Sequence, residues 1–503
     1  MKLAIGFIGS LLLGGAMALA QGEPATQPQV FEEAIDVRVV NVEAVVTDAK
    51  GERVTGLTAK DLRLLVDGTE VPIEYFAEVV EGKSAAVEAP GAQAPVAAGE
   101  EVGRNYLVYI DESFSVASIR DEVLERLERD LALLAPADRM AVLAFDGSKI
   151  EVLSGWTGDR ALLAAALQKA RKRPAFGSAM LAQQRKLRQD VDWILDNAAS
   201  FEEDEIAAFL DAVSGRISPE ARTQVGKTAP AAASVLRAFE APPGRKVMLL
   251  LSGAWSLGVA PRLYAPLIEA ANRLGYTLYP AEMAQSDARL VTGLDGLARA
   301  TGGRVVASAR LEVFRQVVAD SGSYYWLGFT PAWKADDRGH GIVVETRRTG
   351  LTVRARGGFS DLSPRTANAM KAEGVLLFGG AEGEKRLIVE LGKPRRAGRG
   401  QVEVPVTLGV PVESLALTPA GNGFVAETPV AAAVLDDQGG RADLPASHLK
   451  VTLAAAPRNG TYARFRMVVK LSDAQQRLVF TVRDPLSGGT LWGDADFKPR
   501  RAK

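Results

Sequence analysis

The chain has 503 residues, of which 47% are hydrophobic, and its 60 basic and 61 acidic residues give a formal net charge of -1. Such a length corresponds to about three globular units, and the apolar fraction is enough to build real cores. A nearly neutral chain without a domain-scale basic stripe has no field that attracts nucleic acid, so we expect no nucleic-acid partner. The absence of cysteine excludes disulfides, thiolate nucleophiles, Cys-ligated zinc and a lipidated N-terminal cysteine.

The first twenty residues have the pattern of a signal peptide. Lys2 supplies a positive start, Leu3–Leu13 is apolar, and Ala18-Leu19-Ala20 offers the small-x-small pattern that signal peptidase cleaves. The apolar stretch is short for a membrane span and lacks a basic stop-transfer flank. No later segment is apolar enough to cross a bilayer, so we expect an exported protein, periplasmic or secreted, without a membrane span.

The segment that follows predicts a small β region. Residues 21–30 are rich in Pro and Gln and predict a flexible leader. Within 31–82, apolar residues alternate as in strands, and Asp67-Gly68 predicts a tight hairpin. Residues 83–102 are rich in Ala, Pro and Gly, which predicts a linker.

The middle of the chain predicts an α/β domain. Between 103 and 320, short apolar strands such as Lys246–Leu251 are spaced by amphipathic helices such as 118–134. Apolar strands of this kind are typical of a parallel sheet covered on both faces, which is a doubly wound, Rossmann-like α/β domain. Residues from about 180 to 240 interrupt the alternation of strands and helices, which predicts a helical insertion.

The β pattern then returns. We expect β hairpins over 321–360, a linker with a short helix over 361–374, and an all-β sandwich over 375–503. Neither 31–82 nor 321–360 has enough strands to close a core, although each has an apolar alternating face. The sequence therefore predicts that these two segments pair into one sandwich, with the α/β domain inserted between them.

One loop has residues suited to bind a ligand. The run Asp111-Glu112-Ser113-Phe114-Ser115 follows the first α/β strand and precedes its helix. Ligands gather at this edge of a doubly wound sheet. One carboxylate and two hydroxyls, from Asp111, Ser113 and Ser115, can offer oxygen ligands to Mg²⁺ or Mn²⁺. A different interpretation makes Ser113 or Ser115 the cap of the following helix.

The loop, the expected sheet order and the flanking β segments resemble a family of exported bacterial proteins related to the von Willebrand factor type A (VWA) domain. The resemblance covers about 31–360. It also rests on five sequence segments that are similar to the family: Val39–Asp48, Val54–Leu65, Gly244–Gly253, Ser321–Pro331 and Val353–Phe359.

The resemblance implies a metal-ion-dependent adhesion site, which adds a Thr from a second loop and an Asp from a third. The second loop is expected near 176–179, where Ser178 could replace the Thr hydroxyl. The third departs from the pattern, because Gly253 stands where the family has Asp. Loss of a carboxylate weakens a site for a divalent ion, although Glu112 or Asp146 could substitute. The sequence leaves open whether this degenerate site binds metal.

No catalytic signature accompanies this loop. The sequence has no Gly-x-Ser-x-Gly elbow and no His-Glu-x-x-His helix, and His340 and His448 lie in separate β regions. We therefore expect a non-enzymatic protein that binds an unknown protein partner in the cell envelope, with Trp255 near the loop as a partner contact. The alternatives are a metal-independent structural envelope protein and a hydrolase with an unrecognised site.

Overall fold

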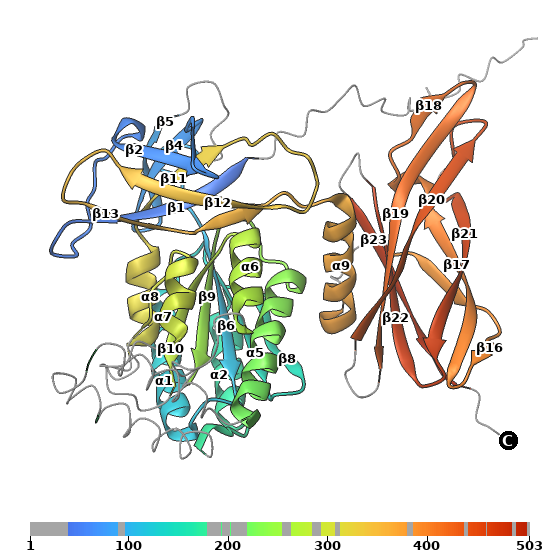
Figure 1. Cartoon of the computed structure of the whole chain (residues 1–503), viewed down its shortest axis with the longest axis horizontal. Helices are drawn as coiled ribbons and strands as arrows, with labels where there is room; N and C mark the ends of the chain where they lie inside the picture. The colour runs from blue at the N-terminus through green and yellow to red at the C-terminus, as the bar shows by residue number, and fades with distance from the viewer. Residues whose placement is uncertain are drawn as a thin grey trace, which may run out of the picture.

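The computed structural model describes residues 39–88, 96–178, 193, 202, 219–253, 263–283, 293–306, 312–379, 386–436, 441–458, 460–484 and 489–499. The expected signal peptide and leader lie outside these residues. The described part of the chain is rich in strands, which form several sheets. Figure 1 shows them as three units: a β-sandwich above one end of an α/β unit, and a second β unit beside both.

The α/β unit is built on a five-stranded sheet of order β10-β9-β6-β7-β8. Its strands are β6 (Arg104–Asp111), β7 (Arg139–Phe145), β8 (Ile150–Thr157), β9 (Arg245–Ser252) and β10 (Tyr276–Glu282). The first four strands in that order run parallel, and β8 is antiparallel at the edge. Every residue of β6 is buried, because helices cover both faces of the sheet.

Of the helices in the described residues, three pack against each face. One face holds α1 (Ala117–Asp130), which continues into the 3-10 turn η2 (Leu131–Leu133), α2 (Arg160–Arg171) and α8 (Val313–Ser321). The other holds α5 (Pro219–Ala238), α6 (Ala265–Leu274) and α7 (Gly293–Ala300). No helix in the described ranges is long and apolar enough to cross a bilayer.

The helix α5 corrects the predicted insertion over about 180–240. Its apolar face, including Val225, Ala229 and Leu236, is buried in the core against the sheet. Gly226 and Pro230 within the helix hide its amphipathic pattern in the sequence. Small alanines on the buried face also give a weak apolar signal, although they let the helix approach the sheet closely. Residues 219–238 therefore belong to the α/β core rather than to an insertion.

The N-terminal sandwich combines strands from 31–82 and 321–360. One sheet has the order β13-β1-β11-β4-β5 and the other β14-β12-β2-β3. The strands are β1 (Val40–Thr47), β2 (Leu62–Val66), β3 (Thr69–Val71), β4 (Tyr75–Val80), β5 (Lys83–Glu88), β11 (Tyr324–Phe329), β12 (Gly339–Thr346), β13 (Thr352–Ala355) and β14 (Gly358–Ser360), with a 3-10 turn η1 (Ala59–Asp61) before β2. The register joins distant segments, for example Val42 to Leu327 and Leu64 to Val344.

The strand β5 corrects the linker predicted from residue 83. Glu81 and Gly82 both have positive φ, 50° and 77°, which is the geometry of a two-residue hairpin turn. The turn leads β4 into β5, and the two strands pair antiparallel. Because alanine is uncommon in strands, the Ala-rich composition gives no strand signal here, and the Glu81-Gly82 turn is the feature that indicates a hairpin.

A buried carboxylate joins the N-terminal sandwich to the α/β unit. Asp320, at the end of α8, accepts hydrogen bonds from Arg354 at 2.7 and 2.9 Å and from the Tyr279 hydroxyl at 2.7 Å. Arg53 and Arg304 lie within ion-pair distance of the same carboxylate. Burial by itself raises the pKa of Asp320, but the charge and hydrogen bonds of Arg354 outweigh it, so that the pKa is lowered. This cluster fixes the position of one unit against the other.

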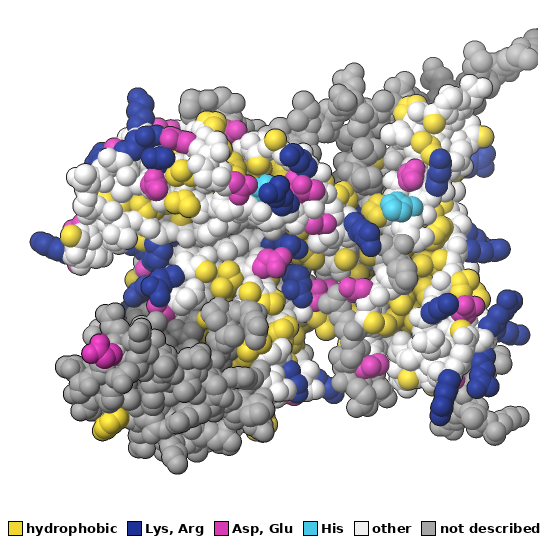
Figure 2. All heavy atoms as spheres, in the orientation of Figure 1, with side chains coloured by type: hydrophobic (Ala, Val, Ile, Leu, Met, Phe, Trp, Pro, Cys, Tyr) yellow, Lys and Arg dark blue, Asp and Glu magenta, His cyan; other side chains and the backbone are white. Residues whose placement is uncertain are grey.

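The C-terminal unit contains two packed sheets. The strands are β15 (Ile388–Leu391), β16 (Arg395–Gly398), β17 (Gln401–Pro411), β18 (Thr418–Ala420), β19 (Gly423–Asp436), β20 (Arg441–Leu453), β21 (Tyr462–Ser472), β22 (Gln476–Arg483) and β23 (Thr490–Phe497), with a 3-10 turn η6 (Val412–Ser414). In one sheet β17 pairs with β15, β16 and β21, and in the other β19 pairs with β18, β20 and β22. A shared apolar core lies between them. Figure 2 shows Lys and Arg side chains along the outer side of this unit.

The helix α9 (Pro364–Phe378) confirms a helix within 361–374, but it corrects the predicted linker there and the start of the C-terminal unit at 375, because the helix is packed and ends at Phe378. The Ser363 side chain caps its start, Pro364 occupies the first turn, and Gly379 ends it with φ 78°. The helix packs between α5 and the sheet of β19 and β22 (Figure 1). At Gly374 a Cβ would lie 2.3 Å from the carbonyl oxygen of Ala238, so this contact requires glycine.

Candidate functional site

The candidate site lies where the strand order of the central sheet reverses. From β6 the chain crosses to β7 on one side, whereas β9 pairs with β6 on the other side and leads to β10. Asp111 and Ser252 are the last residues of β6 and β9, and the register pairs the preceding residues, Ile110 with Leu251. Loops that leave neighbouring parallel strands in opposite directions open a crevice between them, and ligands of α/β sheets bind there.

The Asp111 carboxylate accepts hydrogen bonds at both oxygens. Its Oδ1 accepts from the backbone N–H of Ser113 at 3.1 Å, and its Oδ2 accepts from the Ser252 hydroxyl at 2.7 Å. Asp111 and Ser252 both have a relative exposure of 0%. The serine at the end of β9 therefore reaches across to the acid at the end of β6.

The two serines of the loop are also engaged. The Ser115 hydroxyl donates to the main-chain carbonyl of Asp111 at 2.6 Å, which ties the turn before α1 to the strand. The Ser113 hydroxyl accepts a hydrogen bond from the side-chain amide of Gln224 at 2.8 Å. Gln224 belongs to α5, so this helix closes the site from the second face of the sheet.

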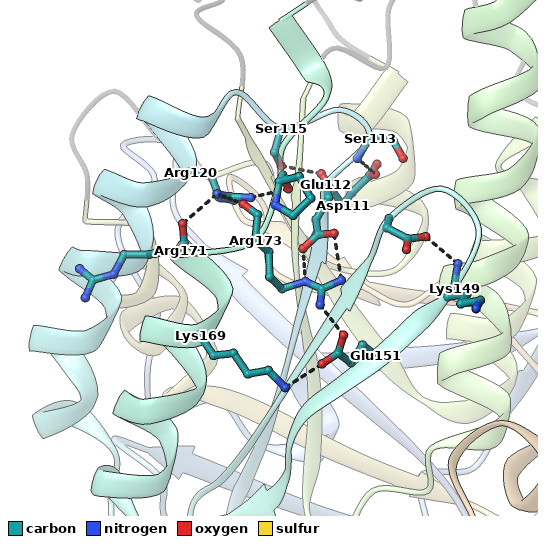
Figure 3. A network of polar contacts seen from close by, with 12 residues as sticks. Asp111, Glu112, Ser113, Ser115, Arg120, Lys149, Glu151, Lys169, Arg171 and Arg173 are labelled. Carbon is teal, nitrogen blue, oxygen red and sulfur yellow. Dashed lines mark hydrogen bonds and ion pairs between the residues drawn. The ribbon is translucent and has the colours of Figure 1, made fainter.

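Glu112 points to the opposite side of the loop, into an ion-pair network (Figure 3). Its carboxylate is fully buried and accepts hydrogen bonds from the guanidinium of Arg173, which also pairs with Glu151. The hydrogen bonds that Arg173 donates to Glu112 raise the pKa of Arg173. Lys169 donates to Glu151 at 2.7 Å, and this hydrogen bond, with help from Arg173, lowers the pKa of Glu151.

A second loop, after α2, is held against the first. The guanidinium of Arg120 is almost completely buried and donates to the carbonyl oxygens of Arg171, Arg173 and Pro174 (Figure 3). The backbone N–H of Phe176 donates to the Glu112 carbonyl at 2.8 Å, and that of the next residue donates to the Ser115 carbonyl at 3.0 Å. At Gly177 a Cβ would lie 2.7 Å from the Ser115 carbonyl oxygen. The second loop is thus fixed by backbone contact.

The predicted site residues are therefore placed as follows. Asp111, Ser113 and Ser115 share one hydrogen-bonded turn, whereas Ser178 is exposed and follows the buried Gly177. The Phe176 side chain is 53% exposed, although its backbone is anchored. Ala254 and Trp255 lie outside the described residues.

A divalent metal does not fit the described donor set in this arrangement. Mg²⁺ and Mn²⁺ need several oxygen ligands, of which one or two are usually carboxylates. Asp111 supplies one carboxylate, and both its oxygens already accept hydrogen bonds. The expected substitutes are engaged as well: Glu112 pairs with Arg173, and Asp146 accepts the N–H groups of Ser148 and Lys149. The described residues contain no group of three or more His, Cys, Asp or Glu that could hold a metal ion.

Sequence reasoning missed three members of the site. Gln224 lies in α5, within the segment predicted to be an insertion. Arg173 and Arg120 carry no local motif, and only their partners from other elements show what they do. The position of Arg173 shortly before Phe176 and Gly177, in the loop expected to lie beside the Asp111 loop, is a signal that could have suggested its contact with Glu112.

Comparison with known proteins gives weak neighbours. No protein-family model matches the sequence, and no curated protein matches it. Among solved structures, the SpRpn10 VWA domain aligns with a TM-score of 0.23 and 9% identity, over 43% of this chain and 95% of that domain. A Bacteroides uniformis beta-glucuronidase aligns with a TM-score of 0.14 and 8% identity, over 36% of this chain and 19% of that enzyme. At these scores neither alignment carries a functional argument.

Proposed function

We propose that the protein is an exported, non-enzymatic binding protein whose α/β unit is a doubly wound VWA module. The edge of its central sheet at which the parallel strands end holds a protein partner without a resident metal ion. The strand order β8-β7-β6-β9-β10, with an antiparallel β8 at the edge, supports this module. The Asp-x-Ser-x-Ser loop at the end of β6 supports the same assignment.

The observation that carries the proposal is an exposed aromatic side chain on a rigid backbone. The exposed side chain of Phe176 lies at the edge where the strand order of the central sheet reverses, which we call the switch point. Arg120, Glu112 and the Phe176 backbone N–H hold its loop in place. Exposed aromatics supply much of the affinity at protein interfaces, and a preordered loop loses little conformational entropy on binding. This edge therefore has the properties of an interaction surface.

The chemistry around the loop supports binding rather than catalysis. The three serine hydroxyls near Asp111 are hydrogen-bonded to Asp111 or Gln224, and no imidazole adjoins them in the described residues. His340 lies in the N-terminal sandwich, where it stacks on Phe359 and contacts Asp67, and His448 lies in β20. A nucleophile without a base within reach is not activated for attack.

The test compares two variants of equal exposure. Phe176→Ala removes the aromatic at the switch point, and Val343→Ala removes a side chain that is 52% exposed on β12 of the sandwich. Immobilised wild type and both variants are incubated with cell-envelope extract, with Mg²⁺ or with a chelator. We expect a partner that wild type and Val343→Ala retain and that Phe176→Ala loses, irrespective of Mg²⁺. Identical retention by all three proteins, or retention that requires Mg²⁺, contradicts the proposal.

Export is tested separately. Native protein purified from the envelope is expected to begin at Gln21, because Ala18 and Ala20 present small side chains to signal peptidase. N-terminal sequencing that finds Met1 in the mature protein would refute export by this route, without affecting the proposed binding surface.

A further inference from the structure

A second site lies at the other edge of the central sheet. A cavity of about 610 Å³ lies where the N-terminal sandwich meets the starts of β6 and β9. Its lining includes Lys246 of β9, Leu274 at the end of α6, and Trp326 and Arg356 of the sandwich. This volume is in the range that holds small organic ligands. Because the strands are parallel, the cavity is separated from Asp111 by the length of β6.

Arg356 is a buried cation without an ionic partner. Its side chain donates to the carbonyl oxygens of Asn272 and Asn41, while its Nε–H has no hydrogen-bond partner. In the described chain no carboxylate lies within ion-pair distance of its guanidinium. Burial lowers the pKa of Arg356, which reflects the free-energy cost of holding this charge away from water.

Lys246 is a second cation in the same cavity. Its ammonium donates to the Leu274 carbonyl at 3.1 Å and lies 5.7 Å from the ring centre of Tyr276. Burial lowers the pKa of Lys246, and the nearby charge of Arg356 lowers it further, against the opposite effect of Glu43. An ammonium has three N–H donors. A carbonyl and an aromatic ring leave room for an anionic acceptor.

The walls of the cavity are aromatic. Trp326 is 8% exposed, and its indole N–H has no hydrogen-bond partner. Trp333 and Phe359 also line the cavity, and their rings contact each other edge to face. Flat apolar walls beside unpaired N–H donors complement a ligand with an apolar ring and acceptor oxygens.

The charge balance sets the charge of the ligand. Glu43 is the half-buried carboxylate of the lining, while Glu100 and Glu101 are exposed at its margin, where water screens them. Arg273 already pairs with Glu269. Lys246 and Arg356 against Glu43 leave an excess of one positive charge.

We propose that this cavity binds a small organic monoanion, an aromatic ring with a short side chain that ends in a carboxylate. Lys246 and Arg356 provide the charge that holds the carboxylate, and Trp326 lies against the ring. Glu43 opposes binding, because its charge repels the ligand. This site is independent of the binding surface at Phe176.

The test uses two probes that differ by one charge. Indole-3-acetate and its neutral amide, indole-3-acetamide, are titrated calorimetrically into the full chain. We expect the acid to bind about tenfold more tightly than the amide, a difference of about 1.4 kcal/mol, because a charge-assisted hydrogen bond is stronger than a neutral one.

Two substitutions move the affinity in opposite directions. Lys246→Met should weaken binding of the acid about tenfold, and Glu43→Gln should strengthen it about threefold, since the removed charges attract and repel the ligand respectively. Lys450→Met removes an exposed lysine of β20 and should change nothing. Thermal melting of each variant confirms that it is folded before titration.

Three results overturn the proposal. One is equal binding of acid and amide, which means that the cavity does not sense charge. Another is weaker binding of indole-3-acetate by Glu43→Gln, which means that the charge of Glu43 does not oppose the anion and that the proposed charge balance is wrong. The third is no heat with either probe at millimolar concentration in folded protein.

Discussion

At the C-terminal edge of the central sheet, buried acidic groups accept hydrogen bonds from side chains: Asp111 from Ser252, and Glu112 from Arg173. In the cavity at the N-terminal edge the buried charges are basic, and Lys246 and Arg356 donate to backbone carbonyls. Both edges are formed by the same strands. The first edge is a closed network that rigidifies its loops, whereas the second keeps N–H donors that a ligand could use.

The direction of the helices gives a physical reason for this difference. Parallel strands place the starts of the following helices at one edge and the ends of the preceding helices at the other. The carbonyl oxygens at the end of α6, those of Asn272 and Leu274, attract cations to the N-terminal edge. A buried charge can therefore be held either by an opposite charge or by helix-end dipoles. Only the second arrangement leaves net charge for a ligand.

The largest expected effect comes from breaking the closed network. Arg173→Met leaves Glu112 buried without its cation, and we expect the free energy of unfolding to fall by about 3 kcal/mol. Urea denaturation followed by circular dichroism measures this change. The matched control is Arg129→Met, which removes an exposed ion pair with Glu125 and should cost less than about 1 kcal/mol. Equal losses in the two variants would show that the network at this edge adds no stability.

A smaller effect is expected from adding a carboxylate to the same edge. Wild type should melt at one temperature with or without millimolar Mg²⁺, because Asp111 alone binds the ion too weakly. Gly253→Asp should gain about 1 kcal/mol in excess Mg²⁺, or about 2–4 °C in melting temperature. The gain should vanish when Asp111→Ala is combined with it. A Mg²⁺-dependent shift in wild type that Asp111→Ala abolishes would instead support a functioning metal site.

The smallest effect is expected at the N-terminal edge. Lys246→Met removes a buried cation that lacks a carboxylate partner, so stability at neutral pH should stay the same or rise by up to about 1 kcal/mol. The pKa of Lys246 is lowered in the folded protein, so the unfolded chain holds the proton at pH values where the folded chain has lost it. Wild-type stability therefore recovers as pH rises toward 10.5, and its difference from the variant should shrink. Urea denaturation at neutral and alkaline pH checks this, and a variant clearly less stable than wild type would contradict it.

Local patterns were informative where neighbouring residues determine the structure. Alternating apolar residues marked the sandwich strands, and Asp67-Gly68 adopts the positive-φ turn that this pair favours. Asp111, Ser113 and Ser115 lie at the end of β6 as their place in the sequence suggests. The helix α9 shows the limit: the sequence predicts a short helix inside a linker over 361–374, whereas the helix runs from Pro364 to Phe378 between its signals at Ser363 and Gly379 and packs against other elements.

The sequence by itself determined the order of the β and α/β regions and the residues of the turn after β6, because strand periodicity and turn chemistry are local properties. It also predicted the pairing of the segments around 42 and 327, because each segment alone has too few strands to bury its apolar face. Tertiary structure alone decided the partners. Gln224 reaches Ser113 from 111 residues away, Arg173 reaches Glu112 from 61, and Arg356 lies beside Lys246 only once the sandwich docks. Charges and amides reveal no partner in sequence, since their contacts depend on the three-dimensional packing of separate elements.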